Sequence, residues 1–241
     1  MEIEESIKKL QKKIDESSNI VFFGGAGVST DSGMKDFRSK DGLYNVKSDQ
    51  PAEYMLSFAC FYKEPEKFYE YYKLNMNSTK YKPNITHKYL AKLEKTGKLK
   101  AIITQNIDGL HQKAGSKNVL EVHGTVERNH CLNCNKFYPS TYIFNSISIP
   151  KCECGGIIKP DVVLYGEMLP QAYVDAQKYI YEADMLIVAG TSLVVEPASS
   201  LVKLFHGKNL VILNNEKTPY DTKANLVIHH NLKEIFSKLK I

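Results

Sequence analysis

The chain has 241 residues, 43% of them hydrophobic and 24% charged, which suits one large domain or one core with a small insertion. The formal net charge is +5, and the basic residues are scattered rather than grouped in a stripe, so we expect no direct nucleic-acid binding. No N-terminal segment resembles a signal peptide, and no run approaches the roughly 20 apolar residues of a membrane span. We therefore expect a cytoplasmic protein without membrane contacts.

Residues 1–19 carry apolar residues at every third or fourth position, with lysine and glutamate between them, which predicts an amphipathic helix. A short apolar run at 20–23 predicts a buried strand, and glycines follow it directly. From about 42 to 82 the composition shifts to tyrosine, phenylalanine, glutamate and lysine without a strand pattern. We expect a helical segment there, with one clear helix over 65–75.

The rest of the chain alternates short apolar runs with helical patterns. Thr86 is predicted to cap a helix that ends near Lys95. The predicted strands span 101–104, 119–122, 185–189, 210–213 and 226–228, and a further apolar run lies at 162–165. The predicted helices span 171–183, 197–205 and 232–239. This alternation predicts an α/β fold with a doubly wound parallel sheet.

Polar or glycine residues follow the carboxyl ends of five predicted strands. They are Gly25, Gln105, His123, Gly190 and Asn214. In a parallel sheet these ends share one edge, and ligands bind there at the point where the strand order reverses. We therefore expect the five positions to converge on one crevice.

The stretch after the first strand predicts a dinucleotide site. Gly25 and Gly27 allow a tight turn and a close approach of the backbone to a ligand, and a helix start behind them would favour a phosphate. Thr30 stands where the common G-x-G-x-x-G pattern has its third glycine, so an ordinary tight turn is the alternative. Further on, Phe37 could cover a planar ring and Arg38 could meet a phosphate.

Four of the five cysteines fall within 24 residues, as a C-x2-C pair, 17 intervening residues and a C-x-C pair. They are Cys131, Cys134, Cys152 and Cys154. Two close pairs of thiolates suit a tetrahedral zinc ion with no open position, so the predicted site is structural rather than catalytic. Unliganded thiols are the alternative. The fifth cysteine, Cys60, lies in an apolar stretch and is expected to be a small buried side chain.

His123 is the candidate general base, because it follows an apolar strand, precedes a glycine and titrates near neutral pH. A surface or core histidine is the alternative, and we expect no catalytic role for the six other histidines. Asn106 and Asp108 follow another strand end and could bind a carboxamide or sugar hydroxyls, unless they only cap a turn. Asn214 could bind ribose hydroxyls without a charge.

The chain resembles the sirtuin family, of bacterial type, over about residues 20–230 and in the family's order. The motifs are GAGVSTDSGMKDFRS, TQNIDGLHQKAG, the VHG around His123, the four cysteines, KPDVVLYGE, AGTSLVVEPA and ILNNEKTP. The resemblance implies one catalytic domain over 1–241, with an inverted Rossmann-type core and a smaller zinc-binding and helical domain. The core would comprise 1–41, 83–127 and 158–241, and the small domain would comprise 42–82 and 128–157.

The resemblance also assigns roles to single residues. It makes His123 the general base and counts Asn106 as catalytic with it. The positions that it assigns to NAD are Ala26, Thr30, Phe37, Arg38, Gln105, Ile107, Asp108, His123, Thr191, Ser192 and Asn214, with the backbone near Leu232. The positions that it assigns to the acyl-lysine tunnel are Phe37, Val163 and Tyr165. The four cysteines would hold a structural zinc.

The implied reaction is NAD-dependent deacetylation of protein lysine, with the acyl group passed to ADP-ribose and nicotinamide released. The acetyl-lysine peptide would add as a strand between 165–167 and 193–196. Relatives that prefer acidic acyl groups carry a Tyr and an Arg three residues apart, whereas here Tyr69 is followed by Tyr72, which favours acetyl or other neutral groups. The alternatives are a mono-ADP-ribosyltransferase or NAD hydrolase, a non-catalytic NAD sensor, and a zinc module that binds nucleic acid.

Overall fold

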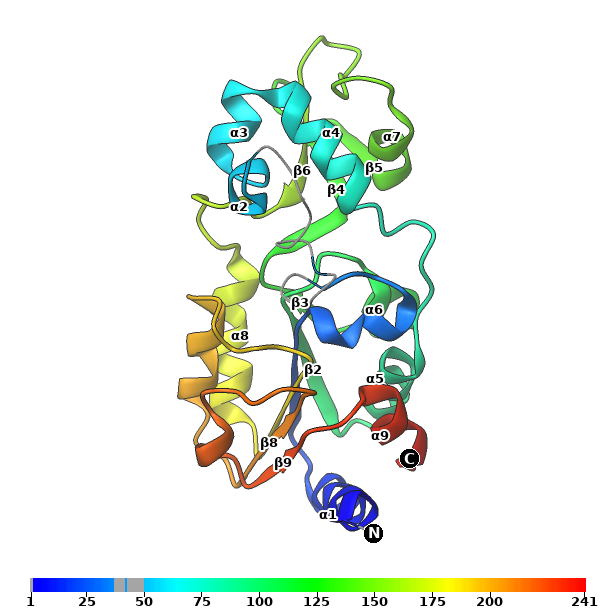
Figure 1. The fold of residues 1–241 in the computed structure, drawn as a ribbon, viewed down its shortest axis with the longest axis vertical. Helices are drawn as coiled ribbons and strands as arrows, with labels where there is room; N and C mark the ends of the chain where they lie inside the picture. The colour runs from blue at the N-terminus through cyan, green and yellow to red at the C-terminus, as the bar shows by residue number, and fades with distance from the viewer. Residues whose placement is uncertain (1, 37–41, 43–49) are drawn as a thin grey trace.

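The computed structural model describes residues 2–36, 42 and 50–241, which form a six-stranded and a three-stranded β-sheet (Figure 1). The larger sheet is parallel throughout and has the order β3-β2-β1-β7-β8-β9. Its strands are β1 (Ile20–Gly24), β2 (Leu99–Thr104), β3 (Val119–Glu121), β7 (Met185–Ala189), β8 (Asn209–Leu213) and β9 (Leu226–Ile228). This is the strand order of a Rossmann fold, so the predicted parallel α/β core is confirmed.

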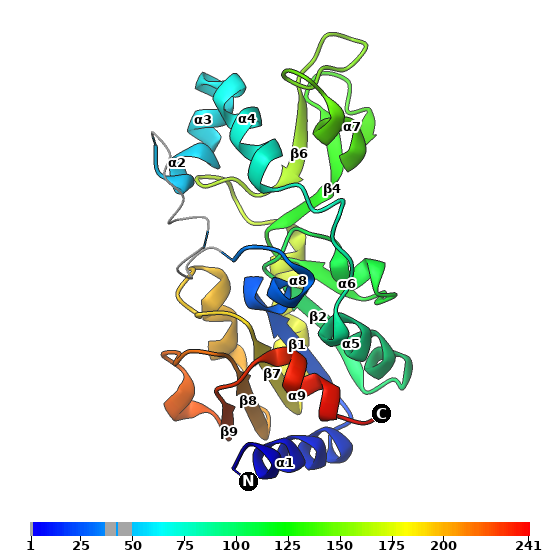
Figure 2. The same ribbon diagram turned by 45° about the vertical axis from the view of Figure 1, so that its right-hand side comes forward.

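Each face of the larger sheet packs against its own helices, because side chains alternate along the strands. In β1, Ile20 and Phe22 belong to one apolar cluster, whereas Val21 and Phe23 belong to another. The first cluster is covered by α1 (Glu2–Glu16), α5 (Ile85–Lys95) and α9 (Leu232–Lys238). The second is covered by α8 (Gln171–Glu182) and the 3₁₀ helix η4 (Ala198–Leu204), as Figure 2 shows.

The smaller sheet is antiparallel and has the order β5-β4-β6. Its strands are β4 (Gly124–Cys131), β5 (Phe137–Pro139) and β6 (Ile158–Val162). Four helices lie with it at one end of the molecule (Figure 2): α2 (Ala52–Met55), α3 (Phe58–Lys63), α4 (Pro65–Asn75) and α7 (Ser140–Asn145). A third apolar cluster joins the helices of 52–76 to this sheet, so segments far apart in sequence share one core.

The remaining described elements are short: η1 (Ala26–Val28), η2 (Thr30–Ser32), α6 (Leu110–Lys113) and η5 (Asp221–Lys223). Within the described part of the chain, no helix is long and apolar enough to cross a membrane.

Three local predictions need correction. The cap of α5 is Asn84 rather than Thr86, because the Asn84 side chain accepts hydrogen bonds from the first free amides of the helix. The predicted helix over 197–205 is a 3₁₀ helix over Ala198–Leu204. The glycine stretch leads into the short turns η1 and η2 instead of a regular helix, so no helix dipole builds up behind it.

Candidate active site

The carboxyl ends of the parallel strands meet in register at one edge, as the sequence predicts. Each residue that follows a strand donates its amide to the last carbonyl of the neighbouring strand. Gln105 bonds to the end of β1 (2.9 Å), Gly25 to β7 (3.1 Å), Gly190 to β8 (3.0 Å) and Asn214 to β9 (3.1 Å). The strand order reverses between β1 and β7, so the two glycine turns lie side by side at the switch point.

The two glycines of the first turn, Gly25 and Gly27, pack directly against the backbone of Gly190. A Cβ on Gly27 would lie 2.7 Å from the Cα of Gly190, and one on Gly25 would lie 2.8 Å from the Gly190 carbonyl oxygen. The amide of Gly25 already bonds to Ala189, and that of Gly27 bonds to the Gly190 carbonyl at 2.8 Å. Neither amide is therefore free for a phosphate, because the packing of the two loops uses both.

Gln105 lies beside the switch point with an unused donor. Its Oε1 accepts a hydrogen bond from the Thr191 hydroxyl at 2.9 Å. Its buried Nε2 has no hydrogen-bond partner among the described residues. A buried amide without a partner is costly, and a ribose, phosphate or carboxamide oxygen would satisfy it. Gln105 thus offers a hydrogen-bond donor that suits an oxygen of a bound nucleotide.

A buried network joins the glycine turn to the segment after β2. The Ser29 hydroxyl donates to Asp108 Oδ2 at 2.6 Å, and Asn106 Nδ2 donates to the Ser29 oxygen at 3.1 Å. The other Asp108 oxygen accepts from the Leu110 amide at 2.8 Å. Burial raises the pKa of Asp108, while the bonds from Ser29 and Leu110 oppose that rise. Ser29 is not among the residues predicted for the site, because its partner lies 79 residues away in the chain.

His123 follows β3 at the same edge, with its ring oriented by the backbone. Its Nδ1 lies 3.1 Å from the carbonyl oxygen of Gln105, which can only accept a hydrogen bond. Nδ1 therefore carries the proton, and Nε2 keeps a free lone pair. Burial lowers the pKa of His123, partly offset by the bond to Gln105, so the neutral form is favoured. This is the protonation state that a general base requires.

The other predicted NAD positions differ in their surroundings. The hydroxyl of exposed Thr30 bonds to the Gly27 carbonyl at 3.0 Å, and Asn214 Nδ2 bonds to the Glu216 carbonyl at 2.8 Å. The side chain of Leu232 lies in the core, which leaves only its backbone for a ligand. The partly exposed predicted positions are Ala26, Ile107 and Ser192. Phe37 and Arg38 lie outside the described residues.

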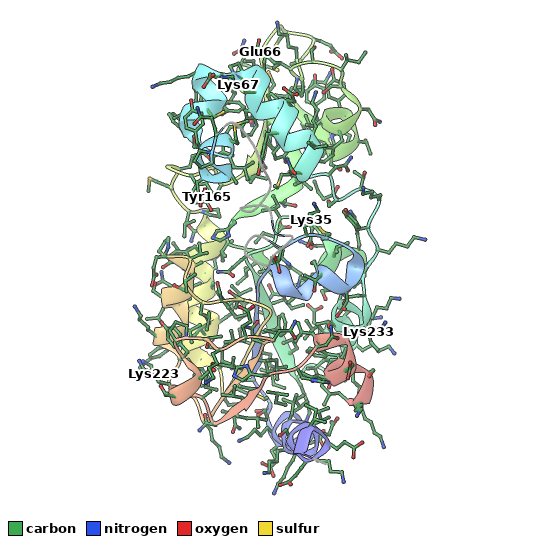
Figure 3. All side chains as sticks on the ribbon, in the orientation of Figure 1. Lys35, Glu66, Lys67, Tyr165, Lys223 and Lys233 are labelled. Atoms are coloured by element: carbon green, nitrogen blue, oxygen red, sulfur yellow. The ribbon has the colours of Figure 1, made fainter. Side chains whose placement is uncertain are left out.

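Two of the three predicted tunnel residues, Val163 and Tyr165, connect the site to the smaller sheet. The Val163 amide donates to the carbonyl of His123 at 2.9 Å, directly beside the candidate base. Tyr165 bonds through its amide and carbonyl to Leu56 and Phe58, at 3.0 and 2.9 Å. Figure 3 shows Tyr165 between the part of the molecule that contains the larger sheet and the part that contains the smaller sheet. Its side chain is exposed.

The four clustered cysteines form one group, as the spacing predicts. Their sulfurs all lie within 4.8 Å of one another. A tetrahedral zinc with Zn–S bonds of about 2.3 Å needs sulfurs about 3.8 Å apart, so the group fits this ion. The Tyr138 hydroxyl donates a hydrogen bond to Cys152 Sγ at 3.1 Å, which lowers the pKa of Cys152 and favours its thiolate. A Cβ on Gly156 would lie 2.7 Å from Cys131 Sγ, so glycine is needed to close the turn.

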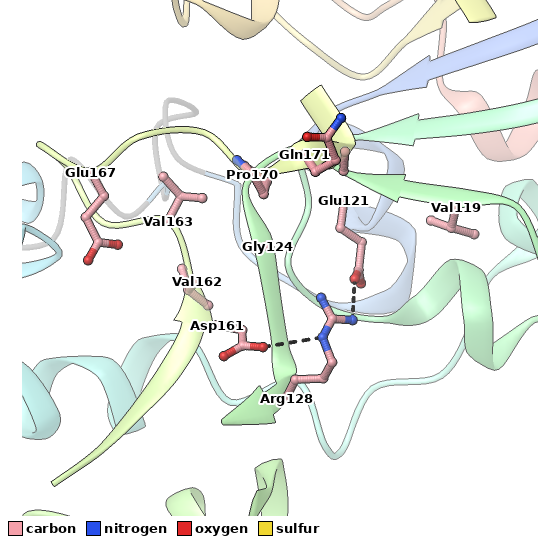
Figure 4. A pocket seen from close by; sticks show the side chains of 11 residues that line it. Val119, Glu121, Gly124, Arg128, Asp161, Val162, Val163, Glu167, Pro170 and Gln171 are labelled. Atoms are coloured by element: carbon pink, nitrogen blue, oxygen red, sulfur yellow. Dashed lines mark hydrogen bonds and ion pairs between the residues drawn. The ribbon is translucent and has the colours of Figure 1, made fainter. Parts of the chain in front are cut away.

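A pocket of about 490 Å³ lies between β3, the smaller sheet and the start of α8 (Figure 4). Arg128 lies across this pocket. Its Nη1 atom is 2.9 Å from Glu121 Oε2, and its Nε atom is 3.5 Å from Asp161 Oδ2. Val163 is the one predicted site residue among its lining residues. Both carboxylates are paired with Arg128, and the pocket is lined by residues of both sheets.

Comparison with known proteins agrees with this geometry. The family model described as "Sir2 family" matches residues 25–197. Proteins named NAD-dependent protein deacetylase are 54% identical in Clostridium tetani, over 95% of this chain and 94% of the relative, and 51% identical in Clostridium perfringens, over 98% and 99%.

Solved structures lead to the same family. A Sir2 structure with a deacetylated p53 peptide and 3′-O-acetyl ADP-ribose superposes with a TM-score of 0.89 at 39% identity, covering 96% of both chains. A Sir2 structure with a p53 peptide and NAD+ gives a TM-score of 0.85 at 39% identity, again covering 96% of both. With its parallel core, its cysteine cluster and these relatives, the chain belongs to the Sir2 family.

Proposed function

We propose that this protein is an NAD-dependent protein-lysine deacetylase that transfers the acetyl group to ADP-ribose and releases nicotinamide. The observation that carries the proposal is the orientation of His123. Its Nδ1 is bonded to the Gln105 carbonyl, and its Nε2 is left as a base at the strand ends. The relatives' names support the same reaction.

The proposed NAD site uses the residues at the switch point. Gln105 supplies its unpartnered Nε2, while Asp108 reads the nicotinamide carboxamide from its fixed position against Ser29. The other proposed contacts are Ala26, Thr30, Phe37, Arg38, Asn106, Ile107, Thr191, Ser192, Asn214 and the backbone at Leu232. When bound, NAD supplies the ribose carbon whose bond to nicotinamide breaks.

His123 and Asn106 are the proposed catalytic residues. Neutral His123 accepts a proton from a ribose hydroxyl at Nε2, and the Gln105 carbonyl stabilises the resulting positive charge through Nδ1. Asn106, held by its bond to Ser29, presents its remaining polar atoms to the ribose. Exclusion of water from the crevice protects the reacting carbon from hydrolysis.

The proposed peptide site lies beside Val163 and Tyr165, with the peptide adding as a strand between 165–167 and 193–196. Val163 connects this strand to the catalytic base, because its amide bonds to His123. Tyr69 and Tyr72 are both buried in the apolar cluster, and neither can pair with a carboxylate as an arginine would. We therefore propose acetyl or other neutral acyl groups as substrates.

We also propose the division into a Rossmann core (1–41, 83–127 and 158–241) and a small domain (42–82 and 128–157). Zinc in the cysteine cluster would hold the second part of the small domain together. Clustered cysteines that are not joined by disulfides persist in a reducing compartment, which supports a cytoplasmic location.

The experiment that tests the function mixes purified protein, NAD and an acetyl-lysine peptide and follows nicotinamide. We expect release with the acetylated peptide and none with the unmodified peptide or without peptide. Release without peptide would instead indicate an NAD hydrolase, and ADP-ribose found on the peptide by mass spectrometry would indicate an ADP-ribosyltransferase. Either outcome contradicts the proposal.

A further inference from the structure

Asn84 makes hydrogen bonds in two directions from one side chain. Its Oδ1 accepts from the amides of Thr86 (2.9 Å) and His87 (3.5 Å), which caps α5. Its Nδ2 donates to the carbonyl of Val28 (2.8 Å) and to the hydroxyl of Ser32 (3.1 Å). Capping uses only the oxygen, so the two bonds from the nitrogen serve a different purpose.

His87 fixes the side of Asn84 that faces the helix. Its Nδ1 accepts from the Asn84 amide at 3.3 Å, which completes a reciprocal capping box. Burial lowers the pKa of His87 to about 4, so the ring is neutral at physiological pH and can accept this bond. The backbone and the side-chain oxygen of Asn84 are therefore both held, and the Nδ2 direction is set.

The acceptors of Nδ2 belong to the turn that is proposed to bind NAD. Val28 ends η1 and Ser32 ends η2, on either side of Ser29. Ser29 is anchored from the crevice side through Asp108, whereas Asn84 anchors the turn from α5. Two anchors on opposite sides leave residues 28–32 in one conformation.

We propose that Asn84 is a positioning residue that holds residues 28–32 in the shape that receives NAD. The inference rests on the proposed function, since it concerns the same cofactor. Asn84 has no proposed contact with NAD itself and acts through Val28 and Ser32. A turn that is already ordered binds NAD more tightly, because binding does not have to supply the free energy of ordering it.

Asn84→Asp and Asn84→Ser test this inference. Both substituents keep an oxygen that can cap α5, and both remove the amide donor. Asn19→Asp is the matched control, because it removes a half-buried amide donor to the Glu182 carbonyl (2.8 Å) at the opposite end of β1. The measurements are hydrogen exchange of the amides of residues 28–33 without ligand, NAD affinity by calorimetry, the KM for NAD and for peptide, and the melting temperature.

We expect both Asn84 variants to melt within about 3 °C of the wild type. Exchange of the turn amides should rise about tenfold, and the Kd and KM for NAD about fivefold, while kcat and the peptide KM stay within about twofold. The control should match the wild type in turn exchange, NAD affinity and both KM values, whatever its melting temperature. Turn exchange and NAD affinity within about twofold of wild type in both variants would overturn the inference. Failure of the proposed function would differ, since it would show in the wild type as no peptide-dependent nicotinamide release.

Discussion

Acid should destabilise this protein through His87, a histidine buried beside the ring of His111 at a centroid distance of 4.7 Å. Burial lowers the pKa of His87 from 6.5 to about 4 in the folded chain. The unfolded chain therefore binds more protons as the pH falls, and stability that is present above pH 6.5 is lost towards pH 4. His87→Gln removes this titration and keeps a polar side chain beside Asn84.

The size of the effect follows from the pKa values. Each pH unit below the unfolded value costs about 1.4 kcal/mol until the folded value is reached. Lowering the pH from about 7.5 to about 5.0 should thus take about 2 kcal/mol from the free energy of unfolding through His87. Burial lowers the pKa of His111 in the same direction, so His111 adds to the total loss in both proteins.

The assay is urea unfolding, followed by circular dichroism, of the wild type and His87→Gln at both pH values. We expect the variant to lose about 2 kcal/mol less than the wild type. Effects of acid on the cysteine cluster occur in both proteins and cancel in this difference. His206→Gln, at an exposed position, is the control and should follow the wild type. Equal losses in the wild type and His87→Gln, within about 0.5 kcal/mol, would refute the reasoning.

Three further predictions concern separate parts of the molecule. His123→Ala should lower the rate of peptide-dependent nicotinamide release by at least about 100-fold, with zinc content and melting temperature unchanged; a rate near wild type would exclude His123 as the base. Cys134→Ser should lower the zinc content found by elemental analysis, and it should weaken the near-ultraviolet circular dichroism of the aromatic residues in the third apolar cluster. Full retention of zinc would contradict the proposed zinc site. Gly97→Ala should cost about 1 kcal/mol, because its φ is +78° and its surroundings are open. Gly124→Ala should cost several times more, because a Cβ would lie 1.9 Å from the Asp161 carbonyl oxygen, and equal unfolding free energies of the two variants would contradict this.

Signals carried by neighbouring residues were enough to predict the parallel core. Apolar runs at 185–189 and 210–213 coincide with β7 and β8, because a strand buried on both faces is apolar at every position. The cysteine cluster was also predictable, since two close pairs of thiols suit a zinc ion wherever the chain brings them together. The placement of His123 after a strand correctly indicated its position at the edge of the sheet.

The smaller sheet could not be predicted in this way. β4 reads GTVERNHC and β5 has three residues, so neither carries a continuous apolar run or a long alternation. β4 pairs with β5 on one side and with β6 on the other, and the sheet packs against the aromatic side chains of α3 and α4, which come much earlier in the chain. Contacts of this kind are not encoded in local periodicity.

Residues close together in the chain specify the class of fold, the cysteine cluster and the strand ends at which the site lies. Which groups remain available at that site depends instead on contacts between segments that are far apart in the chain. The Gly190 carbonyl accepts the hydrogen bond from the Gly27 amide, and Asn84 and Asp108 hold the turn of residues 28–32 from two sides. These partners come from other loops, and their hydrogen bonds exist only once the sheet has brought the loops together.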